Sequence, residues 1–264
     1  MPHDLFIYSK SFCEPSVMGY DHLEEPLVVQ PMSQSPSRSE SYYWENITVQ
    51  VEDNLFRFPK HHLMGRSEAF RSMLAMPQGS NEPEGFSDDR PIKLLGISKI
   101  DFERLLQVLH PMDAQKQPHL STDAWLSVIR LSSLWRLADT RNIAISRLTT
   151  LLWKIDPVDR VILSRNYSVA QWLSSGFIDL VHRVEMVSEE EAEKIGLETA
   201  LQIQRVRETF LRTAYKVEKS NNRFYYQIND TEPSFDRDKV KNAVEKMFKK
   251  ELEIIEADGA LFNE

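Results

Sequence analysis

The sequence predicts an α+β fold, in which a small sheet is flanked by a helical cluster and followed by an all-helical extension. Residues 47–58 hold two short segments that alternate apolar and polar side chains, as strands with one buried face do. From residue 98 onward, apolar side chains recur three and four positions apart, as in helices with one buried face. A chain in which the strands come first and the helices follow is typical of an α+β fold, where sheet and helices form separate layers.

The strands are predicted from their alternation. Residues 47–51 place isoleucine and valine on one face, residues 53–54 supply a tight turn, and residues 55–58 return as the second strand of a hairpin. Residues 92–95 predict a short third strand that a glycine closes.

The helix starts are predicted from side chains that can cap them, because a hydroxyl or carboxylate oxygen accepts hydrogen bonds from the first free backbone N–H groups. Ser188, with Glu191 three residues further on, matches the pattern of a capping box. The expected caps are Ser67, Ser98, Ser121 or Thr122, Asp156, Ser168 and Ser188.

The helices also carry apolar stripes that are expected to face the core. Their members include Phe102, Leu105, Leu106, Leu109, Trp125, Ile129, Leu134, Leu137, Ile143, Ala144, Leu148, Trp172, Leu173 and Phe177. Trp135 and Trp153 fall on or beside such stripes and are expected in the core as well. Trp44 leads the first strand, where core packing is the first interpretation and an exposed docking anchor the second.

Changes in pattern divide the chain into four segments. Residues 1–40 are rich in serine and proline without periodicity and predict a disordered leader. Residues 41–154 hold the sheet and its helices, and residues 155–217 form the helical extension. Residues 218–264 form a tail with a short strand and an amphipathic helix. The stripe of that helix predicts docking on the chain's own body, with docking on a partner as the alternative.

Length and composition predict a soluble intracellular protein of one or two domains. The chain has 264 residues, 41% of them hydrophobic, and Cys13 is its single cysteine, so no internal disulfide is expected. No apolar run reaches the ~18 residues of a membrane helix, and the N-terminus lacks the pattern of a secretory signal. We expect no membrane contact, and cytoplasm or nucleus as the location.

The net charge of −8 disfavours general binding of nucleic acids, which are polyanions. Lysines gather in residues 239–250, but interleaved acidic residues predict a solvated helix face, with a nucleic-acid arm as the alternative. The sequence has no glycine-rich phosphate loop and no nucleophile motif. We therefore expect no enzyme, no cofactor and no small-molecule substrate; an enzyme of unrecognised type is the alternative.

The adjacent His61 and His62 are weighed as metal ligands and as ordinary surface residues. Neighbouring side chains on a helix or strand point in different directions, so the two rings are expected to diverge. We expect His61 at a turn or pocket, His62 in solvent, and no metal site.

Two strings of residues carry a resemblance to a known family. The first runs Phe56-Arg57-Phe58-Pro59-Lys60-His61 and continues with Leu63, Ser67, Phe70 and Met73. The second contains Pro91-Ile92-Lys93-Leu94, Ile97, Phe102, Leu105-Leu106 and Leu109-His110-Pro111. In order and distance they resemble the BTB/POZ family from Tyr42 to about Leu152. Tyr43-Trp44-Glu45 and Ile195-Gly196-Leu197 are similar to a fungal, basidiomycete-like branch of that family.

The resemblance implies a small sheet flanked by helices that self-associates and recruits other proteins. The leading function is a non-catalytic interaction module that forms a homodimer. An adaptor between substrates and a cullin-type ubiquitin ligase is the alternative, and a transcriptional co-regulator is a third implication of the family. Partners are therefore a second copy and other proteins, among them a cullin scaffold.

The family also suggests where a partner binds. It often has an aspartate where this chain has Asn46, beside Glu45, and Lys60 matches its usual basic partner. Cullin-recruiting members carry an apolar-x-Glu motif near the place of Met76-Pro77-Gln78, which departs from it. The candidate interaction residues are Trp44, Glu45, Asn46, Lys60, His61, Met76, Glu82 and Glu84.

Overall fold

The computed structural model of the chain describes residues 37–41, 43–64, 67–75, 84–111, 119–220, 223–228 and 236–262. The chain consists of two units, residues 1–43 and residues 44–264. All helices and strands of the described residues lie in the second unit, which is α+β as predicted. Most of the predicted leader lies outside the described residues.

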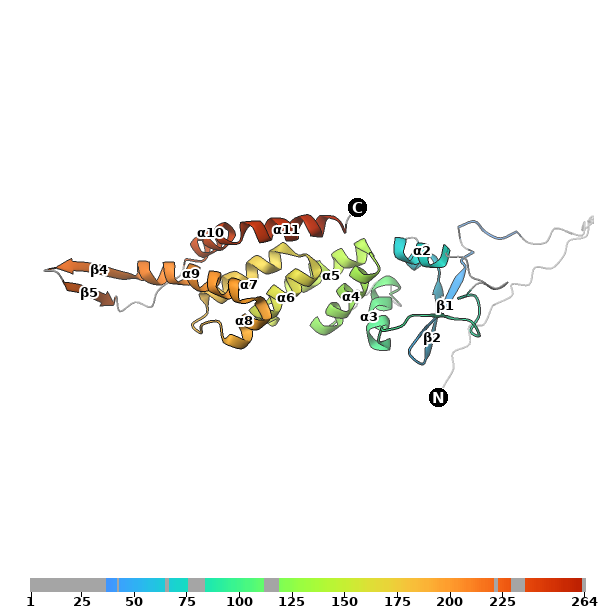
Figure 1. Cartoon of the computed structure of the whole chain (residues 1–264). Coiled ribbons are helices and arrows are strands. Elements are labelled where there is room, and N and C mark those ends of the chain that lie inside the picture. Colours follow the sequence, from blue (N-terminus) through green and yellow to red (C-terminus); the bar gives the residue numbers. More distant parts are fainter. Residues whose placement is uncertain are drawn as a thin grey trace, which may run out of the picture. The chain divides into compact units, whose positions relative to one another are not determined.

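A three-stranded sheet has the order β2-β1-β3, and two of its strands, β1 and β2, are labelled in Figure 1. β1 (Asn46–Val51) and β2 (Asn54–Pro59) form the predicted antiparallel hairpin. β3 (Ile92–Lys93) pairs in parallel with β1. The third strand is shorter than predicted, because Leu95 has left the ladder and is 87% exposed.

Five α-helices and a 3₁₀ turn accompany this sheet. They are α1 (His61–Met64), α2 (Glu68–Ala75), α3 (Lys99–Leu109), α4 (Thr122–Leu134), α5 (Ala138–Thr150) and η1 (Leu152–Lys154). The caps at Ser98 and Ser121 are confirmed, since each hydroxyl accepts the predicted backbone N–H three residues on. Ser67 accepts from Phe70 N–H at 3.2 Å in the same way. A first core joins the sheet to these helices and includes Val49, Phe58, Phe70, Phe102, Leu105, Ile129 and Leu148.

Three apolar residues predicted inside are exposed. Leu134 is 61% exposed, because the buried face at the end of α4 runs through Val128, Leu131 and Trp135, and Leu134 lies outside that face. Ile143 is 46% exposed for the same reason on α5. Trp153 is 74% exposed, since it lies in the 3₁₀ turn, where the helical spacing stops. Three other tryptophans, Trp125, Trp135 and Trp172, are buried as predicted.

The second half of the chain is mainly helical around a second core. The helices are α6 (Pro157–Tyr167), α7 (Ala170–His182), α8 (Glu189–Ile195), α9 (Leu197–Ala214), α10 (Arg237–Met247) and α11 (Lys249–Ala260). α7 contacts α6, α9, α10 and α11 and carries the buried Trp172, Leu173 and Phe177. Asp156 and Ser188 cap their helices as predicted. The prediction for Ser168 was wrong, because this residue ends α6 in the left-handed region (φ 52°) and Val169 precedes α7.

The predicted amphipathic helix of the tail is two helices, separated at Phe248. Its apolar stripe packs into the second core through Val240, Val244, Phe248 and Ile255, so docking on the chain's own body is confirmed. The predicted tail strand belongs to a hairpin of β4 (Tyr215–Ser220) and β5 (Arg223–Ile228) (Figure 1). No helix in the described residues has the length and apolar character needed to span a membrane.

Candidate functional site

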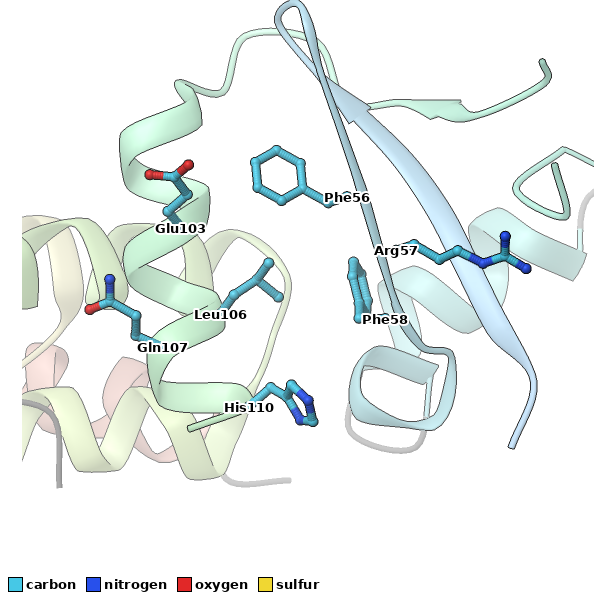
Figure 2. Close-up of a pocket in the computed structure, with 7 residues that line it drawn as sticks. All are labelled: Phe56, Arg57, Phe58, Glu103, Leu106, Gln107 and His110. Atoms are coloured by element: carbon cyan, nitrogen blue, oxygen red, sulfur yellow. The ribbon is translucent and has the colours of Figure 1, made fainter. Parts of the chain in front are cut away.

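A small pocket lies between β2 and α3 (Figure 2). Its volume is about 290 Å³, and most of its surface is apolar. β2 contributes three consecutive residues, α3 contributes three, and the residue that follows α3 contributes the last. The lining residues are Phe56, Arg57, Phe58, Glu103, Leu106, Gln107 and His110.

Secondary structure explains why these residues meet. Successive side chains of a strand point to opposite faces, so Phe56 and Phe58 lie on the α3 side of β2, while the guanidinium group of Arg57 extends away from it (Figure 2). Glu103, Leu106 and Gln107 follow i, i+3 and i+4 and share one face of α3. His110 directly follows the last residue of the helix and lies at the end of that face. Phe102 lies on the neighbouring face, with its ring centroid 5.0 Å from that of Phe56. The pocket therefore rests on the first core.

The polar groups at the pocket do not form an acid–base pair. The carboxylate of Glu103 lies 3.8 Å from the ammonium group of Lys99. His110 follows Glu103 by seven residues, a rise of about 10 Å along a helix, which separates the imidazole from the carboxylate by far more than a hydrogen bond. This geometry suits binding better than proton transfer.

A chain of aromatic rings begins at one end of the pocket. The ring of His110 lies 4.8 Å from that of His62, which stacks on His61 at 4.4 Å, and His61 lies 5.4 Å from Trp44. We call Trp44, His61, His62 and His110 the aromatic row. Trp44 is 56% exposed, so it is not part of the core, and its exposure agrees with the alternative interpretation as a docking anchor. The row and the pocket share His110 and so form one continuous surface.

The stacking of His61 on His62 corrects the expectation that these rings diverge. His61 is the first residue of α1, a helix of four residues. No preceding helical turn restricts its side-chain rotamer, so its ring can turn back toward its neighbour. Two residues predicted to act separately thus belong to one surface.

Glu45 and Lys60 fix the junction of the two strands beside this row. The Lys60 ammonium group lies 3.4 Å from the Glu45 carboxylate, and the Lys60 N–H donates to the Glu45 carbonyl oxygen at 2.8 Å. The Lys60 ammonium group also lies 5.5 Å from the centre of the Phe86 ring. Asn46 begins β1 and pairs with Pro59 at the end of β2. The junction carries a positive and a negative group side by side.

Five of the eight predicted interaction residues thus lie together, namely Trp44, Glu45, Asn46, Lys60 and His61. Glu84 is exposed in the loop before β3, and Met76 and Glu82 lie outside the described residues. The prediction placed the helix that begins near His62 at the dimer contact, but it missed Phe56, Leu106, Gln107 and His110 as site residues. The helical spacing of Glu103, Leu106, Gln107 and His110 is visible in the sequence. These four side chains are both polar and apolar, however, so they do not resemble an apolar core stripe.

A second cavity of about 600 Å³ lies where α6 and α9 meet the junction of α10 and α11. Most of its lining residues are polar or charged, among them Lys246, Lys249 and Lys250, although about half of the lining surface is apolar. Arg165 lines it but is already engaged, because its guanidinium group donates to Glu251 at 2.8 Å and to Thr199 at 2.9 Å. These bonds hold α11 to α6 and α9, so we assign the cavity's polar lining to the docking of the tail.

Within the described residues, no three histidine, cysteine, aspartate or glutamate side chains are placed to share a metal ion. Comparisons with protein-family models and with curated proteins found no match to this chain. The function is therefore argued from the site, since a fold alone does not define one.

Proposed function

We infer that this chain is a non-catalytic protein-interaction module that binds a second copy of itself through its BTB/POZ-like region. The observation that carries this proposal is the continuous surface formed by the aromatic row and the apolar pocket between β2 and α3. Exposed aromatic side chains beside a small apolar pocket are the usual anchors of protein interfaces.

The order of the elements supports the resemblance on which the proposal draws. The chain begins this region with the β1–β2 hairpin, which two short helices follow. A third strand, parallel to β1, comes next, and then α3, α4 and α5. This agrees with the small sheet flanked by helices that the BTB/POZ family implies. The residues that carry the resemblance include Phe58, Phe70 and Phe102, all buried in the first core.

The size and chemistry of the pocket favour a protein partner over a small molecule. Ligand pockets usually measure about 300–1,000 Å³ and enclose most of the ligand. The pocket at α3 measures about 290 Å³ and lies open beside an edge strand. It has room for one or two apolar side chains of a partner protein.

A second copy of the chain fits the charges next to the row. A two-fold axis brings the same patch of both copies together, so a residue of one copy meets its complement in the other. Glu45 and Lys60 are neighbours of opposite charge. Placed about a two-fold axis, Lys60 of one copy faces Glu45 of the other, and like charges are kept apart.

Light scattering after size-exclusion chromatography tests this function, with Trp44→Ala as the variant and Trp153→Ala as its matched control. Both tryptophans are exposed, at 56% and 74%, so neither substitution empties a core site. We expect a mean mass above one chain for the wild type at tens of micromolar. Loss of an aromatic anchor costs about 2 kcal/mol, so Trp44→Ala weakens association about thirtyfold.

Trp153→Ala should leave the mean mass unchanged. A wild-type chain that stays monomeric at tens of micromolar contradicts the proposal. A Trp44→Ala variant that associates like the wild type contradicts the assignment of the surface.

An adaptor that binds a cullin scaffold is the second candidate, and one observation favours it. Leu95 and Ile100, around the start of α3, are 87% and 59% exposed. They follow in the chain the acidic loop before β3, where Glu84, Asp88 and Asp89 are exposed. Co-purification of a cullin with the wild type, and its loss with Leu95→Glu, would support this function. A wild-type chain that retains no cullin at micromolar concentration would refute it.

A further inference from the structure

Within the residues that the structure describes, the hairpin of β4 and β5 that follows α9 forms a sheet of two strands. Each strand therefore has one edge that pairs with no strand of the described residues. An isolated two-stranded hairpin is at best marginally stable in water, and three or more strands are usually needed for a stable sheet. This hairpin stands to gain stability from a further strand.

The register divides the hairpin positions between two faces. Tyr215 pairs with Ile228, Val217 with Tyr226 and Lys219 with Phe224. Because paired positions share a face and neighbours alternate, these six positions form one face, in which lysine is the only charged residue. The other face holds Lys216, Glu218, Ser220, Arg223, Tyr225 and Gln227.

We propose that β4 pairs antiparallel with β4 of a second copy of this chain, about a two-fold axis at Val217, to complete a four-stranded sheet. In this register Val217 lies opposite Val217 of the second copy. Lys216 lies opposite Glu218 of the second copy, and Glu218 opposite Lys216. The pairing therefore places two pairs of opposite charges directly across the new strand boundary, an arrangement that stabilises sheets.

Charge selects this register over its neighbours. A shift by two positions in one direction places Lys216 opposite Lys216 of the second copy. A shift by two positions in the other direction places Glu218 opposite Glu218 of the second copy. Directly opposed like charges destabilise a sheet. A shift by one position sets the apolar face of one hairpin against the polar face of the other. Only the register centred on Val217 avoids both conflicts.

The same argument selects β4 rather than β5 as the pairing edge. The only charged residue of β5 is Arg223, so a two-fold pairing of β5 offers no pair of opposite charges. β4 carries both signs, at Lys216 and Glu218. The occupant of the β4 edge is therefore a second copy of the same strand.

This contact uses other residues than the aromatic row and does not depend on it. A chain in which these two two-fold contacts join different second copies assembles beyond a dimer. A chain with the hairpin contact alone stops at a dimer.

Disulfide trapping in the full-length chain tests the register. Cys13→Ser removes the natural thiol, and Val217→Cys then places two thiols opposite each other at a spacing of about 5 Å, within reach of a disulfide. Lys219→Cys is the matched control, because its two thiols are offset by four residues, about 13 Å along the strands. We expect rapid cross-linking at position 217 and none at position 219 under mild oxidation.

Charge reversal in the Val217→Cys chain tests the two ion pairs. Lys216→Glu and Glu218→Lys should each slow cross-linking about tenfold, because each places like charges opposite one another. A mixture of the two variants should form the mixed cross-linked dimer at close to the original rate, since the opposite charges again face each other. Equal cross-linking rates for the Val217→Cys chain, its two charge-reversed variants and their mixture would overturn the proposal. Cross-linking at position 219 would overturn it as well.

The same trapping in a Trp44→Ala background separates this contact from the proposed function. Cross-linking at position 217 should persist there, whether or not the aromatic row binds a second copy. Loss of cross-linking in that background would show that the hairpins meet only as a consequence of the other contact and would refute an independent interface.

Discussion

Phe102→Ala is expected to cost about 3–5 kcal/mol of unfolding free energy, because it empties a fully buried aromatic site. Phe102 is 0% exposed. Its ring lies 5.0 Å from Phe56, 6.1 Å from Phe58 and 6.0 Å from Trp135. The substitution removes the packing beneath the pocket and the links between β2, α3 and the end of α4. Such a loss is a large part of a typical total stability of about 5–15 kcal/mol.

Phe86→Ala is the matched control, since Phe86 is 53% exposed and loses mainly its contact with Lys60. We expect this control to cost less than about 1 kcal/mol. Urea denaturation followed by far-ultraviolet circular dichroism measures both variants. Equal midpoints for the two variants, or a loss below about 1 kcal/mol for Phe102→Ala, would refute the packing described for α3.

Two further predictions concern the helices that surround the second core. Gly259→Ala should lower stability by about 1–3 kcal/mol in urea denaturation, because a Cβ would lie 2.5 Å from the Ser168 carbonyl oxygen; an increase would show that α11 does not pack there. Hydrogen bonds from Arg183 lower the pKa of Glu191 from 4.5 to about 2. A lowered pKa stabilises the folded state above pH 4.5 and loses this effect as pH falls toward about 2. Solvent screening reduces the gain, so Glu191→Gln should cost about 1 kcal/mol at pH 7 and little near pH 2; a cost that is equal at both pH values would contradict this ion pair.

Features set by neighbouring residues were predictable from the sequence. The caps at Ser98, Ser121 and Asp156 and the capping box at Ser188 depend on side chains within three residues of the backbone groups they bind. Ser168 shows the limit of this reasoning. A serine between two helices can begin the second or end the first, and here a left-handed backbone conformation ends α6.

The site depends on contacts between distant segments, and these could be predicted only in part. Lys60 and His61 were chosen from a resemblance, and Trp44 also as an aromatic residue at the start of the first strand. The three residues do lie together. His110 comes from the end of α3, and nothing in its neighbourhood indicates that it meets His62. Contacts of this kind follow from the packing of α3 on β2, which the periodicity of either segment alone does not reveal.

Hydrogen–deuterium exchange of the wild-type chain at low and high concentration tests the central claim most directly, because it shows which backbone amides a second copy covers. We predict slower exchange at high concentration in peptides from residues 43–64 and 103–111. A chain that associates while these peptides exchange at the same rate at both concentrations would contradict the proposed surface, and a chain with no concentration dependence in any peptide would contradict self-association altogether.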